Sequence, residues 1–278
     1  MKVLLIDISN LTMRCLFSQM PGPEEEDFSV FKLTFLASFM KLIKTLEPDR
    51  VICLQDSESW RKKVYPEYKA TRAAKREQSV VNFDVFFPVL EKFLNAISDS
   101  FKNIPFVKIQ NTEADDIIAT IVKTHPEWDI INVSSDKDFY QLFRYSNYKQ
   151  YDGMKHTFIE GLDPEKELMI KIITGDTSDN IPGLKRGVGP KRALKIIEED
   201  LNKWIEDEKL TEAYQRNMKL ISFNCIPKEI ENSIIAVINN LTYGEPDTKK
   251  YFKFIQMSGL AELMNTFTDY VNLIKKVH

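Results

Sequence analysis

Three short apolar runs in this sequence each end at an aspartate or just before one. The runs and their acids are Val3–Ile6 with Asp7, Val51–Leu54 with Asp56, and Ile130–Val133 with Asp136. Apolar runs of this length are typical of strands buried on both faces, as in a parallel sheet. The carboxyl ends of parallel strands share one edge of a sheet, where α/β proteins bind ligands. The sequence therefore predicts a sheet with acids gathered along one edge.

The segments between these runs have the spacing of helices. Apolar residues recur with a helical period over Phe31–Leu46 and Phe83–Ile97, and Thr112 is positioned as the N-cap of a helix through Lys123. The other predicted strands are Phe106–Ile109 and the two arms of a hairpin at Asp152-Gly153, Asn147–Tyr151 and Lys155–Ile159. We expect an α/β fold whose mostly parallel central sheet has helices on both faces.

The pattern changes near residue 160, after which the chain of 278 residues looks helical throughout. We predict an α/β core over residues 1–160, which includes a basic segment at about 60–79. We predict a C-terminal helical lobe over residues 161–278, with a helix-hairpin-helix-like element at about 176–197.

Bulk composition excludes several classes of protein. Lysine and arginine number 38 against 41 acids, a formal charge of −3, so total charge alone does not indicate a nucleic-acid partner. The cysteines Cys15, Cys53 and Cys225 form no CxxC pair, which predicts neither a disulfide framework nor a zinc site. No apolar run reaches the roughly 20 residues of a membrane span, and Asp7 comes too early for a signal peptide. We expect a protein of the reducing cytosol without a membrane contact.

Nine carboxylates lie at the predicted sheet edge or just beyond it. They are Asp7, Asp56, Glu113, Asp115, Asp116, Asp136, Asp138, Asp176 and Asp179. So many negative charges repel one another unless a cation lies among them. None of the nine candidates is a histidine or a cysteine, so the ligands are oxygens, which suit Mg²⁺ or Mn²⁺ rather than zinc. Two such ions about 4 Å apart can clamp the attacking and leaving oxygens of a phosphodiester.

Each of these acid clusters alone also fits a plainer role. Asp-containing turns are common at strand ends, and a solvated acidic face would explain any one cluster. Thr112 with Asp115 is close to a capping box, which would make that cluster a helix start and nothing more.

The first basic segment, Trp60–Arg76, carries no core pattern. Its cations are Arg61, Lys62, Lys63, Lys69, Arg72, Lys75 and Arg76, and Trp60, Tyr65 and Tyr68 are interleaved with them. Cations pair with phosphates and aromatic rings stack on unpaired bases, so the segment predicts DNA contact beside Asp56. Lys69 and Arg72 lie three apart and would share a face of a helix. A solvated linker with incidental charge is the alternative.

The second basic segment, Ile181–Ile197, combines glycines with cations and contains no acid. Its members are Gly183, Lys185, Arg186, Gly187, Gly189, Lys191, Arg192 and Lys195. Glycines let the backbone N–H groups approach a phosphate, with a helix N-terminus behind them. The pattern indicates a helix-hairpin-helix element that grips duplex backbone without reading sequence. An ordinary helix-to-helix turn is the alternative.

Five motifs occur in order along the chain. They are Asp7-Ile8-Ser9-Asn10, Tyr65-Pro66-Glu67-Tyr68-Lys69, Glu113-Ala114-Asp115-Asp116, Ser135-Asp136-Lys137-Asp138-Phe139, and Gly175-Asp176-Thr177-Ser178-Asp179-Asn180-Ile181-Pro182-Gly183. Together they resemble the flap endonuclease and 5′→3′ exonuclease family, which includes the 5′-nuclease domains of bacterial DNA polymerases. The C-terminal part, including Phe223–Pro227 and Lys250–Leu263, resembles more loosely the ribonuclease H type of T-even phages, which removes primers. The sequence departs from the family pattern at Gln55, where Phe is usual, and at Lys185-Arg186, which adds one residue to the common bacterial hairpin.

The resemblance implies a two-metal phosphodiesterase. The first Mg²⁺ would be held by Asp7, Asp56, Glu113, Asp115 and Asp136, and the second by Asp138, Asp176 and Asp179, partly through water, with Asp116 in the outer shell. Lys69 and Arg72 would be catalytic residues at the base of a helical arch, close to the scissile phosphate. Residues 183–195 would hold the duplex, around a K⁺ ion bound by backbone carbonyls.

The function that follows is a structure-specific 5′-nuclease, acting as 5′→3′ exonuclease and flap endonuclease to remove RNA primers and flaps in DNA replication. Expected partners are branched or nicked DNA, RNA-DNA duplex, and replication proteins such as a sliding clamp or a single-strand-binding protein. We expect a monomer in the cytosol of a bacterium or phage host. The alternatives are a PIN-type ribonuclease, against which the glycine hairpin and basic segment argue, and a nuclease-dead branched-DNA-binding module, which would lack carboxylates.

Overall fold

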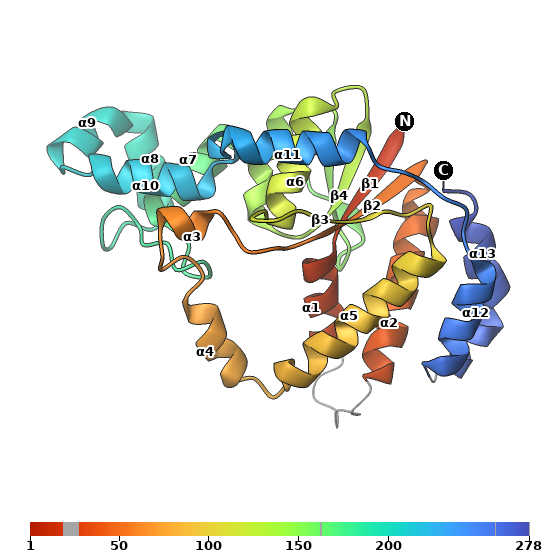
Figure 1. Cartoon of the computed structure of the whole chain (residues 1–278). Coiled ribbons are helices and arrows are strands. Elements are labelled where there is room, and N and C mark those ends of the chain that lie inside the picture. Colours follow the sequence, from red (N-terminus) through yellow and green to blue (C-terminus); the bar gives the residue numbers. More distant parts are fainter. Residues whose placement is uncertain (19–27, 162, 259, 278) are drawn as a thin grey trace.

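The computed structural model describes residues 1–18, 28–161, 163–258 and 260–277. At its centre is a six-stranded sheet with the order β3-β2-β1-β4-β5-β6 (Figure 1). The strands are β1 (Lys2–Asp7), β2 (Arg50–Gln55), β3 (Phe106–Lys108), β4 (Asp129–Val133), β5 (Tyr148–Asp152) and β6 (Thr157–Phe158). All neighbouring strands are parallel except β5 and β6, which form the predicted hairpin. The expected mostly parallel sheet is confirmed.

Each buried strand sends alternate side chains to opposite faces of the sheet. In β1, Leu4 and Ile6 belong to one apolar core, whereas Val3 and Leu5 belong to the other. The first core is closed by α1 (Ile8–Phe17), α2 (Ser29–Leu46) and α5 (Phe83–Ser100), and the second by α6 (Ala114–Thr124) and the 3-10 helix η1 (Lys137–Arg144). Helices on both faces explain why the strand runs contain no alternating polar residues.

The helix α6 does not begin with Thr112 as its N-cap, which corrects the prediction. The N-cap is Glu113, and Asp116 completes the capping box by accepting a hydrogen bond from the Glu113 backbone N–H at 3.2 Å. Thr112 instead donates its hydroxyl to the carbonyl of Gln110 at 3.1 Å. The true capping box therefore involves Asp116 rather than Asp115.

The chain after residue 160 is helical, as predicted, but it packs in two places. The helices α7 (Pro164–Thr174), α8 (Pro190–Glu199), α9 (Leu201–Asp207) and α10 (Thr211–Ile221) lie together at one end of the sheet (Figure 1). After the 3-10 turn η2 (Phe223–Cys225), α11 (Lys228–Asn239) packs on α6, α12 (Thr248–Met257) on α5, and, beyond η3 (Ala261–Thr266), α13 (Phe267–Ile274) on α2.

The last three helices, α11, α12 and α13, contribute to the two cores of the sheet. The division of the chain into two domains at residue 160 stays a prediction. Within the described part of the chain, no helix is long and apolar enough to cross a membrane.

Candidate metal centre

Four acids from four elements meet at the carboxyl edge of the sheet. Asp7 ends β1, Asp56 follows β2, Asp136 follows β4, and Asp115 lies in the first turn of α6. Three of them also have the plainer role that the sequence left open, because one oxygen of each accepts a backbone N–H. Asp7 accepts from Asn10 at 2.9 Å, Asp56 from Ala114 at 2.8 Å, and Asp136 from Asp138 at 2.9 Å. These hydrogen bonds fix the position of each carboxylate at the edge of the sheet.

The charges of these four acids act on one another. Burial, followed by the charge of Asp56, raises the pKa of Asp7 to about 7. Burial and the charges of Asp7 and Asp136 raise the pKa of Asp115 well above its usual range. The pKa of Asp136 is also raised, by lost hydration and by acids of the neighbouring group, against the attraction of Lys171. Burial and mutual repulsion make these carboxyl groups resist ionisation. A divalent cation bound among them would stabilise their ionised form.

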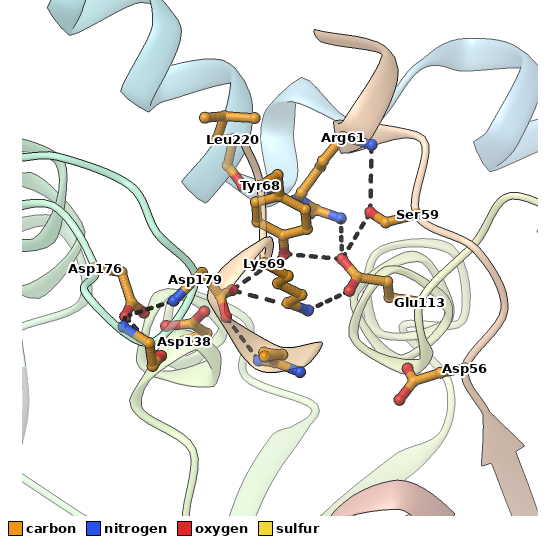
Figure 2. Close-up of polar contacts among 12 residues, drawn as sticks. Asp56, Ser59, Arg61, Tyr68, Lys69, Glu113, Asp138, Asp176, Asp179 and Leu220 are labelled. Carbon is orange, nitrogen blue, oxygen red and sulfur yellow. Dashed lines mark hydrogen bonds and ion pairs between the residues drawn. The ribbon is translucent and has the colours of Figure 1, made fainter. Parts of the chain in front are cut away.

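A second group consists of Asp138, Asp176 and Asp179, which each place one carboxylate oxygen within 4.8 Å of the others (Figure 2). Lys171, on the last turn of α7, contacts Asp138 and lies 2.8 Å from Asp176. Burial alone would raise the pKa of Asp176, but hydrogen bonds from Lys171 and Ser178 outweigh it and lower that pKa to about 2. An ammonium group therefore lies among these three acids.

Glu113 and Asp116 form a buried ion-pair network with Arg61, the first residue of α3 (Arg61–Val64). The Arg61 guanidinium lies 3.0 Å from Glu113 and 2.8 Å from Asp116, and its Nε donates to the carbonyl of Leu220 at 2.7 Å. Trp60 Nε1 donates to Asp116 at 3.1 Å. Both oxygens of Asp116 thus have protein partners in the interior, which suits the outer position that the resemblance implies.

This network corrects three expectations for the first basic segment. The segment does contribute to the core, because Trp60, Arg61 and Tyr68 are 6%, 3% and 3% exposed. Arg61 is committed to Glu113 and Asp116 and has no free edge for a phosphate. Trp60 and Tyr68 are covered on both sides and cannot stack on unpaired bases.

Tyr68 joins the ion-pair network of Arg61 to the second group of acids (Figure 2). Its hydroxyl lies 3.0 Å from Glu113 and 3.1 Å from Asp179, and its ring packs with Leu168 and Ile172 of α7. Burial, followed by the negative charge of Glu113, raises the pKa of Tyr68, so the hydroxyl stays protonated and donates. The position of the segment relative to the acids is therefore set by Tyr68 as well as by Arg61.

Lys69 and Arg72 both reach the acids, although not from one helix face. Lys69 has a positive φ of 58° and precedes α4 (Thr71–Glu77), which carries Arg72, so the expectation of a shared helix face is wrong. The backbone N–H of Lys69 donates to the carbonyl of Asp179 at 2.9 Å. Its ammonium contacts Glu113 and lies 3.8 Å from Asp179, while Arg72 lies 2.6 Å from Asp179.

The charges around Glu113 explain why its carboxyl group is ionised. Burial would raise its pKa, but Lys69 and Arg61 outweigh that effect and lower the pKa to about 2. Glu113 Oε2 also accepts hydrogen bonds from Ser59 at 2.9 Å and from Tyr68 at 3.0 Å. Glu113 is therefore ionised and fully partnered, whereas Asp7 and Asp115 are crowded by other acids.

Comparison with known proteins identifies the family of this chain. Residues 2–172 match the model of the 5′-3′ exonuclease, N-terminal resolvase-like domain. The chain belongs to the 5′-3′ exonuclease family. It is 29% identical to ribonuclease H of Enterobacteria phage T4, over 96% of this chain and 95% of that protein. It is 32% identical to the flap endonuclease Xni of Shewanella denitrificans, over 70% of this chain and 76% of that protein.

The fold of this exonuclease-family chain is also that of a solved relative. The flap endonuclease D15 of bacteriophage T5, determined in a complex with DNA and metal ions, superimposes with a TM-score of 0.68 at 22% identity, covering 93% of this chain and 100% of that one. A structure of the T5 5′-exonuclease with bound zinc ions gives a TM-score of 0.67 at 22% identity, covering 87% of this chain and 99% of that one.

The exonuclease-family motif at Gly175 is shaped by close backbone contacts. Gly175 has a φ of +72°, and a Cβ there would lie 2.4 Å from the carbonyl oxygen of Ile181. Asp176 and Ile181 exchange backbone hydrogen bonds of 2.8 Å across this turn. A Cβ on Gly183 would lie 2.7 Å from the carbonyl oxygen of Thr174. The two glycines thus permit the tight turn that presents Asp176 and Asp179 to the other acids.

The second basic segment lies in the loop between α7 and α8 and on α8 itself. Its cations Lys185, Arg186, Lys191, Arg192 and Lys195 are all exposed. Lys185 pairs with Glu208 at 2.5 Å, and Gly189 is the N-cap of α8. Gly187 has a φ of +82°, which favours glycine. A helix, a glycine loop and a second helix follow one another here; duplex binding and a K⁺ site stay predictions. Lys75 and Arg76 on α4 are also exposed.

Two residues of the site were not predicted from the sequence. Lys171 was missed, although a cation five residues before Asp176 is the signal that could have pointed to it. Asn217 of α10, fully buried, donates to the carbonyls of Ile172 and Pro182 at 2.9 Å each and so holds α7 and the glycine turn together. An asparagine on a helix carries no sequence signal for that role.

Proposed function

We propose that this chain is a structure-specific 5′-nuclease that hydrolyses phosphodiesters at the 5′ ends and flaps of branched duplexes with two divalent ions. The observation that carries the proposal is the gathering of acids from five segments at one sheet edge or just beyond it, with raised pKa values at Asp7 and Asp115. Family membership supports the same reaction class. Mg²⁺ is the expected ion, and Mn²⁺ would substitute, since every available ligand is a carboxylate oxygen.

The donor set fits two ions. The first ion would be held by Asp7, Asp56, Asp115 and Asp136. The negative charges of these acids crowd one another, and no cation among the described residues lies as close to them as Lys171 lies to the second group. Asp138, Asp176 and Asp179 would hold the second, since their oxygens lie within 4.8 Å of one another. Glu113 would also serve the first ion, while it stays paired with Arg61 and Lys69. When bound, the ions lower the pKa of water and neutralise charge that develops on the phosphate.

The side chains of the protein have distinct tasks around these acids. Lys69 and Arg72 bring two positive charges to the mouth of the site, where a scissile phosphate would lie, and both are anchored on Asp179. Preorganised charge of this kind stabilises a transition state because it needs no reorganisation during reaction. Tyr68 and Arg61 position the segment that carries Lys69, so their effect on catalysis is indirect.

Binding of the substrate duplex is assigned to the exposed cations of the α7–α8 loop and of α8. The T5 relative in complex with DNA supports a DNA partner, and the name of the T4 relative, ribonuclease H, supports an RNA-containing substrate. Primer removal rests on the resemblance. A sliding clamp or a single-strand-binding protein as a partner, the monomeric state and the host cytosol remain parts of this proposal that rest on the resemblance.

The proposal is tested by mapping products from a 5′-labelled flap and from a nicked RNA-DNA duplex, with Mg²⁺ and with a chelator. We expect cuts near the branch point with Mg²⁺ and none with the chelator. Asp138→Asn should abolish cutting with flap binding retained, whereas Asp269→Asn, an exposed acid on α13, should cut normally. Cleavage of unstructured single-stranded RNA alone would favour a PIN-type ribonuclease, and binding without cutting would make the chain a recognition module.

A further inference from the structure

A groove is lined by residues of α5 and α12 and by Lys32 of α2. These three helices lie on the side of the molecule away from α7–α10 (Figure 1). Its volume of about 680 Å³ is within the range of about 300–1,000 Å³ that is usual for ligand clefts. The apolar side chains that line it are Val89, Phe93, Ala96, Phe254 and Met257. Met257 is 76% exposed, which is unusual for a side chain of its size and leaves an apolar wall open to solvent.

The charge of the groove is strongly positive. Four lysines line it against one acid, Asp99, which lies 3.5 Å from Lys250. The others are Lys32, Lys92 and Lys253. The groove therefore has a net formal charge of +3 in a chain whose total is −3. An apolar floor with cationic walls is complementary to an anionic ligand that also has an apolar part.

Lys32 gives the second indication of a ligand. It lines the groove from the first turn of α2, and its ammonium group has neither a hydrogen bond nor an ion pair with any residue that the structure describes. The residue as a whole is only 9% exposed, so its aliphatic stem is covered while the ammonium group keeps its contact with water. The ammonium group is therefore free to pair with a carboxylate that a ligand brings in.

We propose that this groove binds an acidic segment of another protein, with a bulky apolar side chain between α5 and α12 and carboxylates on Lys32 and the rim lysines. Segments of this kind dock between helices through an apolar anchor and gain their specificity from the surrounding charge. The groove shares no residue with the acid clusters of the nuclease site, so the two sites can be filled together. The proposal does not depend on the proposed nuclease function.

The binding test uses a fluorescein-labelled peptide in which Asp residues surround a pair of Phe residues, and its fluorescence anisotropy with the full chain. We expect saturable binding that weakens as salt is added, and no binding when the Phe pair is replaced by Ser or the Asp residues by Lys. If the Ser peptide binds equally well, the groove is not the site. If unlabelled single-stranded DNA displaces the peptide and binds as tightly, the surface is a nucleic-acid surface and the proposal is wrong.

A matched pair of variants on α12 locates the site. Lys253→Glu reverses a charge in the groove wall, whereas Lys249→Glu reverses an exposed charge outside the groove on the same helix. We expect Lys253→Glu to weaken the peptide by about ten-fold, since attraction is replaced by repulsion, and Lys249→Glu to leave it within about two-fold. Equal losses would mean general charge attraction and would overturn the proposal. Both variants should cleave a flap normally.

The variant Lys32→Met tests whether Lys32 binds the peptide or stabilises the fold. Met has a similar length and no charge, so Lys32→Met should keep the urea midpoint of the free protein close to that of the parent while it weakens the peptide by about ten-fold. A lower midpoint would mean that Lys32 stabilises the fold. Peptide affinity that does not change in Lys32→Met would show that the carboxylates do not reach this lysine. Either result contradicts the assignment.

Discussion

Asp7→Asn should make the metal-free protein more stable at neutral and alkaline pH, even though it removes a metal ligand. Asp7 is 9% exposed and its pKa lies at about 7, raised from 3.8 by burial and by Asp56. Since the folded protein holds this proton more tightly than the unfolded chain, stability is lost as pH rises from about 4 to about 7 and then stays low.

The magnitude follows from the two pKa values. The interval from 3.8 to about 7 corresponds to about 4 kcal/mol, because each pKa unit is worth about 1.4 kcal/mol. Asp115 and Asp136, whose pKa values are also raised, share the repulsion, so we expect a measured gain of about 2 kcal/mol or more at pH 8. Asn caps a helix about as well as Asp, so the hydrogen bond from Asn10 should survive.

The assay is urea unfolding of both proteins in a chelator at pH 4 and pH 8. The difference in unfolding free energy should be small at pH 4 and should favour Asp7→Asn at pH 8. The control is Asp163→Asn, which changes the N-cap aspartate of α7 outside the acid groups and should alter stability equally little at both pH values. If Asp7→Asn is as stable as the parent at pH 8, or less stable, burial and the neighbouring acids do not raise the pKa of Asp7.

Three further predictions concern the segments around the acids. Arg61→Met should lower the unfolding free energy by about 3–5 kcal/mol in urea titrations, because it leaves Asp116 buried without its cation and Glu113 paired with Lys69 alone, whereas Lys63→Met at an exposed position should change it little. Lys69→Ala should lower single-turnover flap cleavage by about 10²-fold and flap affinity, measured in Ca²⁺, by only a few-fold, and equal losses in both would make Lys69 an ordinary backbone contact. Replacement of the three exposed cations of α8 by Ala should weaken duplex binding at every sequence and reduce the slope of log affinity against log salt by about three, and an unchanged slope would remove α8 from the duplex.

The parts of the fold that the sequence predicted are those set by local pattern. Continuous apolar runs identified β1, β2 and β4, because a strand covered on both faces has no polar side to show. The same logic placed Asp7, Asp56 and Asp136 at one edge, since parallel strands end together. Asp176 and Asp179 were also predicted as candidate ligands, whereas the tight turn that Gly175 and Gly183 permit was not.

The roles that sequence missed depend on contacts between distant segments. Arg61 looks like Lys62 and Lys63 in the sequence, yet only Arg61 meets Glu113 and Asp116, more than fifty positions away. The left-handed backbone of Lys69 follows from its bond to the Asp179 carbonyl, so a helical spacing rule could not foresee it. The role of Lys171 depends on the packing of α7, which brings this lysine into contact with Asp138.

The central claim is that the acids form two separate sites for divalent ions, and Mn²⁺ titration calorimetry of the chelator-treated protein tests it most directly. The parent protein should bind two ions. Asp56→Asn, in the group at the strand ends, and Asp176→Asn, in the group beside Lys171, should each lose a different one, so that the double variant binds none. An unchanged number of bound ions in both single variants, or loss of both ions in either one, would contradict the division of the carboxylates into two sites.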